Sequence, residues 1–151
     1  MKQSFDNSVA ILVKAYLNDT LWKGNCYGCA VGNLVAASCG YSLNKVDLDW
    51  GVHAQRWADV FVTTRHQGQE LSPERYKGPA KEQIDSTGYT WKELAQVELA
   101  FETAYPGGYY DKPDHEQGMY QGLMAVVEVL ATIHNIPLEQ ALEAKSLFVK
   151  A

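Results

Sequence analysis

The sequence lacks the features that mark membrane and secreted proteins. No stretch reaches the roughly 18 consecutive apolar residues of a membrane-spanning helix. The first apolar stretch is short, is interrupted by Lys14, and lacks the small-residue cleavage site of a secretory signal. We therefore expect a cytoplasmic protein that does not associate with membranes.

Positive charge is scarce and scattered. Lysine and arginine together number 13 against 18 aspartates and glutamates, which gives a net charge of -5, and there is no run of basic residues. Binding to a nucleic-acid backbone requires clustered cations. The charge balance therefore argues against a nucleic-acid partner.

Cysteines and enzyme motifs are also few. The chain has three cysteines, an odd number that fits a reducing compartment better than a disulfide framework. It contains neither the Gly-x-Ser-x-Gly turn of many hydrolases nor the phosphate loops GxxxxGK and GxGxxG. These absences favour a protein that is not an enzyme.

The sequence does contain the apolar periodicity of helices. Between Met119 and Ile136, apolar residues recur every three or four positions on two adjacent stripes, so that most of the circumference is apolar. The positions left to face water are Gln121, Ala125, Glu128, Thr132 and Asn135. This pattern is typical of a central helix, near residues 113–135, on which other helices pack.

Weaker amphipathic patterns predict the other helices. They cover about residues 5–19, 27–39, 79–87 and 91–105, and a last helix after Pro137 carries along one side Leu138, Ala141, Leu142, Lys145 and Phe148. Residues 49–68 fit a helix better than a shorter helix followed by a strand, because no partner strand is visible elsewhere. With 151 residues, 46% of them hydrophobic, we predict one domain spanning residues 1–151. Its predicted class is all-α, an irregular or orthogonal bundle of about five to seven helices around the central one.

The junction at residues 87–91 has a clear helix-to-helix pattern. Its glycine can end one helix, Tyr89 can fold back, and Thr90 can cap the next helix. Thr90 and Glu93 form a capping box, which predicts a helix start at Trp91. In that helix we expect Leu94, Val97, Phe101 and Ala104 to face inward, with Glu98 and Glu102 at a solvated edge.

The strongest candidate for chemistry is the CYGC motif that contains Cys26 and Cys29. Two thiols at this spacing can bind a metal such as zinc or iron, or form a redox pair, and a nearby helix start would lower the pKa of a thiol. Cys39 lies about 15 Å from Cys29 along a continuous helix, so a metal site would have to be completed by His53, His66, His115 or an acidic residue. The alternative is that the two cysteines are small core residues at a helix start.

Other polar residues have simpler structural explanations. The cluster Asp111, Asp114, His115 and Glu116 could form part of a hydrolytic or metal site, but acids in the first turn of a helix also complement its dipole. His134, at the end of the central helix, is expected to lie in the core or to cap the helix.

Aromatic residues gather beside the loops. Trp22 and Tyr27 flank the break before the second helix, and Tyr109 and Tyr110 lie in a glycine-containing loop. Tyrosine and tryptophan offer contact area and hydrogen bonds at low entropic cost, which makes these four residues candidates for binding a protein or a small ligand. The alternative is that these loops simply fold onto the core.

Two stretches, CYGCAVGNLVA and EQGMYQGLMAVVEVLATIHNI, make the chain similar to small uncharacterised helical proteins of Bacteroidetes and their bacteriophages. This resemblance implies no activity and no site. The preferred hypothesis is a non-enzymatic helical module that binds an unidentified protein or small ligand, and it is compatible with a homo-oligomer. The second hypothesis is a metal-binding or thiol-redox protein centred on Cys26 and Cys29.

Overall fold

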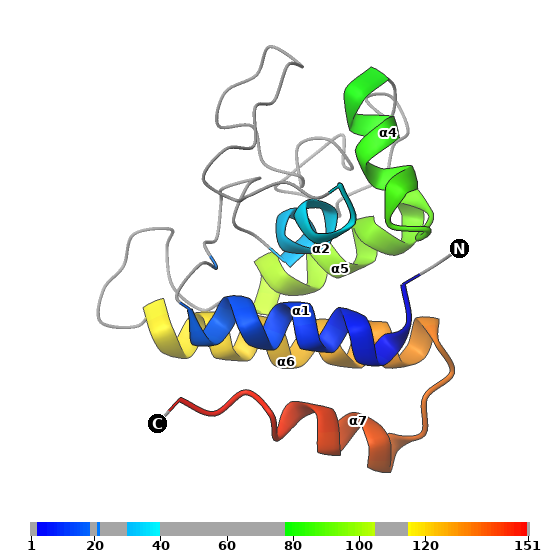
Figure 1. Cartoon of the computed structure of the whole chain (residues 1–151). Coiled ribbons are helices and arrows are strands. Elements are labelled where there is room, and N and C mark those ends of the chain that lie inside the picture. The colour runs from blue at the N-terminus through cyan, green and yellow to red at the C-terminus, as the bar shows by residue number, and fades with distance from the viewer. Residues whose placement is uncertain (1–2, 19–20, 22–29, 40–77, 105–114, 151) are drawn as a thin grey trace.

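The computed structural model describes residues 3–18, 21, 30–39, 78–104 and 115–150 (Figure 1). Six α-helices and no strand lie within these ranges, which confirms the predicted all-α class. The helices are α1 (Phe5–Leu17), α2 (Ala30–Cys39), α4 (Gly78–Ser86), α5 (Trp91–Ala104), α6 (His115–Ile133) and α7 (Leu138–Lys145). The segment 49–68, which the sequence predicts to be helical, lies outside the described residues.

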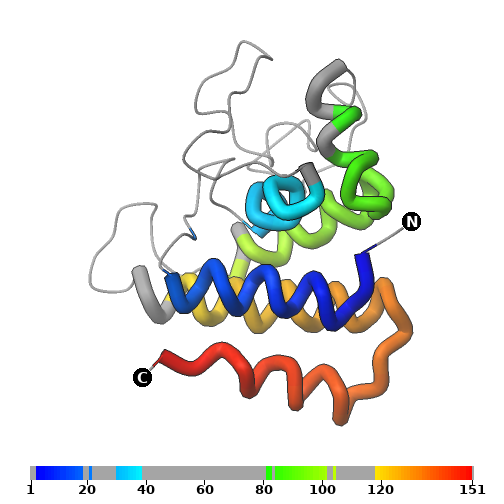
Figure 2. The backbone as a smooth tube through the Cα atoms, viewed as in Figure 1, coloured from blue at the N-terminus to red at the C-terminus, as the bar shows by residue number. Residues whose placement is uncertain are grey.

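α6 is the central helix, as its apolar circumference predicts. α1, α5 and α7 all pack against α6, and α2 packs against α1 and α5. The chain path in Figure 2 shows that α1, α5 and α7 run antiparallel to α6. Ring contacts at both ends fix this direction for α1, because the centroid of Phe5 lies 6.2 Å from that of His134 and the centroid of Tyr16 lies 6.3 Å from that of Tyr120.

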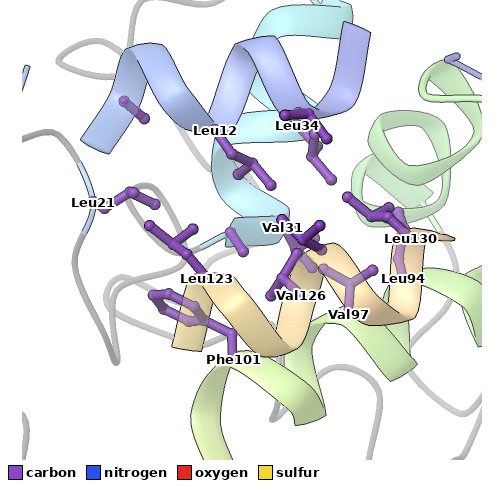
Figure 3. Close-up of a cluster of buried hydrophobic side chains, with 14 of the residues drawn as sticks. Leu12, Leu21, Val31, Leu34, Leu94, Val97, Phe101, Leu123, Val126 and Leu130 are labelled. Carbon is purple, nitrogen blue, oxygen red and sulfur yellow. The ribbon is translucent and has the colours of Figure 1, made fainter. Parts of the chain in front are cut away.

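The solvent face of α6 is the one that its sequence predicts. Gln121, Glu128, Thr132 and Asn135 are exposed, and Ala125 is half-buried. Tyr120 departs from the prediction, since the pattern put it on an apolar stripe but it is 39% exposed. The remaining described positions of the helix supply the core. Figure 3 shows the central side chains of this core, each at most 1% exposed: Leu12, Leu21, Val31, Leu34, Leu94, Val97, Phe101, Leu123, Val126 and Leu130.

The junction between α4 and α5 also follows the prediction. Gly88 takes a positive φ of 77°, which a glycine adopts without strain, and the side chain of Tyr89 folds back into the core at 2% exposure. The capping box is formed in both directions. The amide of Thr90 donates to Glu93 Oε1 at 2.9 Å, and the amide of Glu93 donates to Thr90 Oγ1 at 3.1 Å.

α6 ends in a tight reversal that leads into α7. Asn135 has a φ of 54°, a left-handed conformation that asparagine tolerates better than most residues. The amide of Ile136 donates to the carbonyl of Ala131 at 2.8 Å, the long bond of a Schellman motif. Pro137 then prevents α6 from continuing and directs the chain back along it.

α5 and α6 approach each other most closely at Gly122. A Cβ atom at this position would lie 3.0 Å from both the carbonyl oxygen and Cδ1 of Phe101. The carbonyl belongs to the backbone of α5 and cannot rotate away. The absence of a side chain at Gly122 therefore sets the separation of the two helices.

Gly122→Ala is expected to lower the free energy of unfolding by about 1 kcal/mol. Overpacking costs about 1–3 kcal/mol and outweighs the gain of about 1 kcal/mol in helix propensity. Urea unfolding measures the change. A double-mutant cycle with Phe101→Leu should give a non-zero coupling energy, because the two side chains share the contact; full additivity would contradict the close approach.

Candidate functional site

Most of the site residues predicted from the sequence lie outside the described residues. They are Trp22, Cys26, Tyr27, Cys29, His53, Tyr109 and Tyr110. His115 begins α6, but its side chain is not among those described. In the described part of the chain, no group of three or more His, Cys, Asp or Glu residues could hold a metal ion. The aromatic surface and the cysteine site therefore stay predictions.

A polar network connects three distant parts of the chain. The hydroxyl of Tyr89 lies 2.7 Å from Ser8 Oγ of α1 and 2.7 Å from His134 Nε2 at the end of α6. The rings of Tyr89 and His134 meet edge to face, with their centroids 5.5 Å apart. Tyr89 thus ties the starts of α1 and α5 to the end of α6. Its partners are 81 and 45 positions away in the sequence, so no local pattern could have revealed the network.

The direction of the hydrogen bonds follows from Gln3. Ser8 Oγ donates to Gln3 Oε1 at 3.3 Å, while Gln3 Nε2 donates to the carbonyl of Leu34 at 3.3 Å. Because a hydroxyl has one proton, Tyr89 donates to Ser8, and the protonated Nε2 of His134 donates to Tyr89. Every polar group of Tyr89 and Ser8 is then used inside the fold.

Burial gives this network a structural role, because Tyr89 and Ser8 are 2% and 0% exposed. Burial raises the pKa of the Tyr89 hydroxyl above its ordinary value of 10.0, and the nearby carboxylate of Glu93 raises it further. A raised pKa keeps the phenol protonated, which is the opposite of what a tyrosine base needs. Ser8 is 0% exposed and cannot reach a substrate as a nucleophile. The network therefore fastens the helices together.

The raised pKa of Tyr89 predicts a loss of stability in alkali. Above pH 10 the unfolded chain releases the Tyr89 proton while the folded chain retains it, so the free energy of unfolding falls as the pH rises towards the folded-state pKa. Below pH 10 both states are protonated and this contribution is constant. Urea unfolding at a series of pH values should show a steeper alkaline decline in the wild type than in Tyr89→Phe. Equal slopes would contradict the pKa shift.

A groove of about 560 Å³ lies between α5 and α6 on the solvent side of α6. Its lining is Gln96, Ala100, Ala104, Ala125, Glu128, Val129 and Thr132. Most of these side chains are small because both helices present alanines here. Small side chains permit another helix to approach closely, since interaxial distance depends on the residues at the contact.

α7 places small residues inward and two leucines outward. Ala141 and Ala144 are 4% and 7% exposed, whereas Leu138 and Leu142 are 74% and 53% exposed. The side predicted for this helix is therefore buried only in part, because Ala141 and Phe148 are 4% and 2% exposed while the two leucines on the same side are exposed. The inward face is centred between Ala141 and Ala144, which places the two leucines on a flank of α7 instead of beneath it.

Lys145 connects this leucine flank to the groove. Leu138, Leu142 and Lys145 follow the i, i+4, i+7 spacing of one helix flank. Lys145 Nζ lies 2.6 Å from Glu128 Oε1, and Glu128 lines the groove. The leucines therefore stand along the α7 edge of the α6 surface that contributes to the groove. We call the groove residues together with Leu138 and Leu142 the groove face.

The outward side of α7, next to the leucine flank, is acidic. Glu139 and Glu143 are exposed, and neither forms an ion pair within the described ranges. The Glu128 side chain is 68% exposed, while that of its partner Lys145 is only 20% exposed. On the α5 edge, the exposed Lys92 lies one turn before Gln96. The accessible charge beside the leucines is thus negative.

Glu98 departs from its predicted place. The sequence pattern put it at a solvated edge, but Glu98 is 0% exposed, as are Val97 and Phe101. α5 contacts α2, α4 and α6, so its inward face is broader than the apolar stripe alone indicates. Ala104, predicted to face inward, is half-buried and lines the groove.

Comparison of the chain with protein-family models, with curated proteins and with solved structures gives no match. Among the described helices, none combines the length and apolar character needed to cross a bilayer. Function is therefore inferred from the geometry of this chain alone.

Proposed function

We propose that the chain is a non-enzymatic helical interaction module that binds a protein partner through the groove face. The observation that carries this proposal is α7, which buries alanines and exposes Leu138 and Leu142. Burying a leucine contributes about 1.5–3 kcal/mol. A helix that served only to cover α6 would gain most by turning these leucines inward. Their exposure leaves that free energy available to a bound partner.

The surroundings of the two leucines support a docking surface. Single apolar side chains on a protein surface are ordinary, whereas contiguous apolar surface marks interaction sites. Here the leucines lie on the flank of α7 that carries Lys145. Lys145 pairs with Glu128, which lines the groove together with Ala100, Ala104 and Ala125. Projecting leucines beside an alanine-lined groove provide the shape that helix-in-groove recognition uses.

The Tyr89 network supports the same function by holding the groove in one shape. Tyr89 precedes the start of α5 by two positions, and His134 directly follows α6, so their hydrogen bond of 2.7 Å ties together the two helices that form the groove. A preformed surface loses less conformational entropy on binding than a flexible one.

Selection from a random peptide library tests this proposal even though the natural partner is unidentified. Peptides of about 16 residues, long enough to form a marginal helix, are selected on the immobilised chain. Enriched peptides should bind the wild type and the control Leu17→Ser, which replaces an exposed leucine of α1 outside the groove face. They should lose binding to Leu138→Ser/Leu142→Ser. A lack of enrichment, or equal binding to all three proteins, would contradict a docking function for this face.

A further inference from the structure

Building on the proposed function, we infer that the occupant of the groove face is a basic amphipathic helix. Such a helix carries an apolar stripe of leucine-like residues and lysine or arginine along the flank that meets α7. The inference depends on the shape of the groove and on the charges at its α7 edge.

The groove suits a short length of helix. Its α6 side runs from Ala125 to Thr132, which corresponds to about 10 Å at 1.5 Å per residue. Two turns of a docked helix therefore cover the groove, and two or three apolar side chains at i, i+4 and i+7 fill it. Leu138 and Leu142 would then pack against the side of the docked helix.

The charges on α7 favour a partner helix with a basic flank. Glu139 and Glu143 are one turn apart on α7, a spacing at which like charges repel. Glu139 lies in the first turn, where the helix dipole favours a carboxylate, but Glu143 lies near the C-terminal end, where the dipole opposes it. Cations from a partner beside Leu138 and Leu142 would relieve both the repulsion and the unfavourable dipole interaction.

The same charges argue against a second copy of this chain as the occupant. Two copies meeting at the groove face would bring two acidic surfaces together, because each chain exposes Glu128, Glu139 and Glu143 on α6 and α7. Each chain also carries a net charge of -5. Like-charge juxtaposition disfavours a partner, whereas opposite charge speeds and orients association.

Synthetic peptides of about 18 residues, a length at which isolated helices begin to be stable, provide the test. The Leu/Lys peptide has leucines on one face and lysines elsewhere. The Leu/Glu peptide has the same pattern with glutamates, and a scrambled Leu/Lys peptide has the same composition without an apolar face. Fluorescence anisotropy of labelled peptides measures their affinity for the folded chain at low and moderate salt.

The Leu/Lys peptide is expected to bind the wild type at least about tenfold more tightly than either other peptide. Leu138→Ser/Leu142→Ser should weaken its binding about tenfold or more, as loss of buried leucine contacts implies. Glu139→Gln/Glu143→Gln should weaken it about three- to tenfold at low salt and reduce its dependence on salt. The control Asp6→Asn/Glu82→Gln removes the same charge from exposed positions outside the groove face and should leave the affinity nearly unchanged.

Four results would overturn the inference. Equal affinity for the Leu/Glu and Leu/Lys peptides would show that the α7 edge does not select cations. Equal losses of Leu/Lys affinity in Glu139→Gln/Glu143→Gln and in Asp6→Asn/Glu82→Gln would show that the peptide responds to the net charge of the chain alone. Self-association of the wild type that Leu138→Ser/Leu142→Ser abolishes would identify a second copy as the occupant. In that case, or if library peptides without basic residues bind the groove face, the proposed docking function stands and only the nature of the partner is wrong.

Discussion

Leu130→Ala is expected to lower the free energy of unfolding by about 2–5 kcal/mol. Leu130 is 0% exposed and belongs to the buried cluster in Figure 3, on the side of α6 away from the groove. Truncation to alanine removes the free energy gained when the leucine side chain moves from water into the core. It also leaves a cavity that the surrounding helices α1 and α5 can fill only in part. Urea unfolding, with the m-value unchanged, measures the loss.

Leu17→Ala is the matched control for this prediction. It makes the same chemical change at a leucine that is 45% exposed at the end of α1. We expect a change within about 0.5 kcal/mol, as for surface substitutions away from special features. Similar losses at both positions would contradict the assignment of α6 as the centre of the core.

Tyr89→Phe is expected to lower the free energy of unfolding by about 1–3 kcal/mol, because Ser8 Oγ and His134 Nε2 each lose a hydrogen-bond partner inside the fold. Ser8 is 0% exposed and cannot turn to water, while His134 is half-buried. The ring of Tyr89 and its edge-to-face contact with His134 are retained in phenylalanine. The loss therefore reports the hydrogen bonds and not the packing.

Two comparisons test the origin of this loss. Tyr120→Phe makes the same change at a residue that is 39% exposed and should have little effect. Adding Ser8→Ala to Tyr89→Phe removes both partners of one hydrogen bond, so the double variant should lose less than the sum of the single losses. Strict additivity would contradict a direct Ser8 to Tyr89 hydrogen bond.

Local patterns were sufficient to predict much of this fold. The solvent face of α6 could be read from its sequence because only five positions of a nearly apolar helix were left for water. The boundary between α4 and α5 could be predicted from the sequence because Gly88 adopts a positive φ, and Thr90 and Glu93 cap α5 through hydrogen bonds to each other. Each of these features depends only on residues nearby in the sequence. These features depend on helical spacing and capping, which act over a few positions.

Features that depend on distant parts of the chain could not be read in the same way. The burial of Glu98 results from the number of helices that cover α5. The exposure of Leu138 and Leu142 results from the close packing of Ala141 and Ala144 against the bundle, which a periodic pattern does not distinguish from packing through the leucines. The groove could not be predicted either, because it requires the pairing of α5 with α6.

The urea-unfolding free energy of Leu138→Ser/Leu142→Ser tests the central claim most directly. If the two leucines are available for docking, the double variant should unfold within about 1 kcal/mol of the wild type, since neither position contributes much to the core. A total loss of about 4 kcal/mol or more would correspond to about 2 kcal/mol for each leucine, which is the range of buried positions. Such a loss would show that both side chains are covered in the folded chain. That result would contradict the groove face as a docking surface.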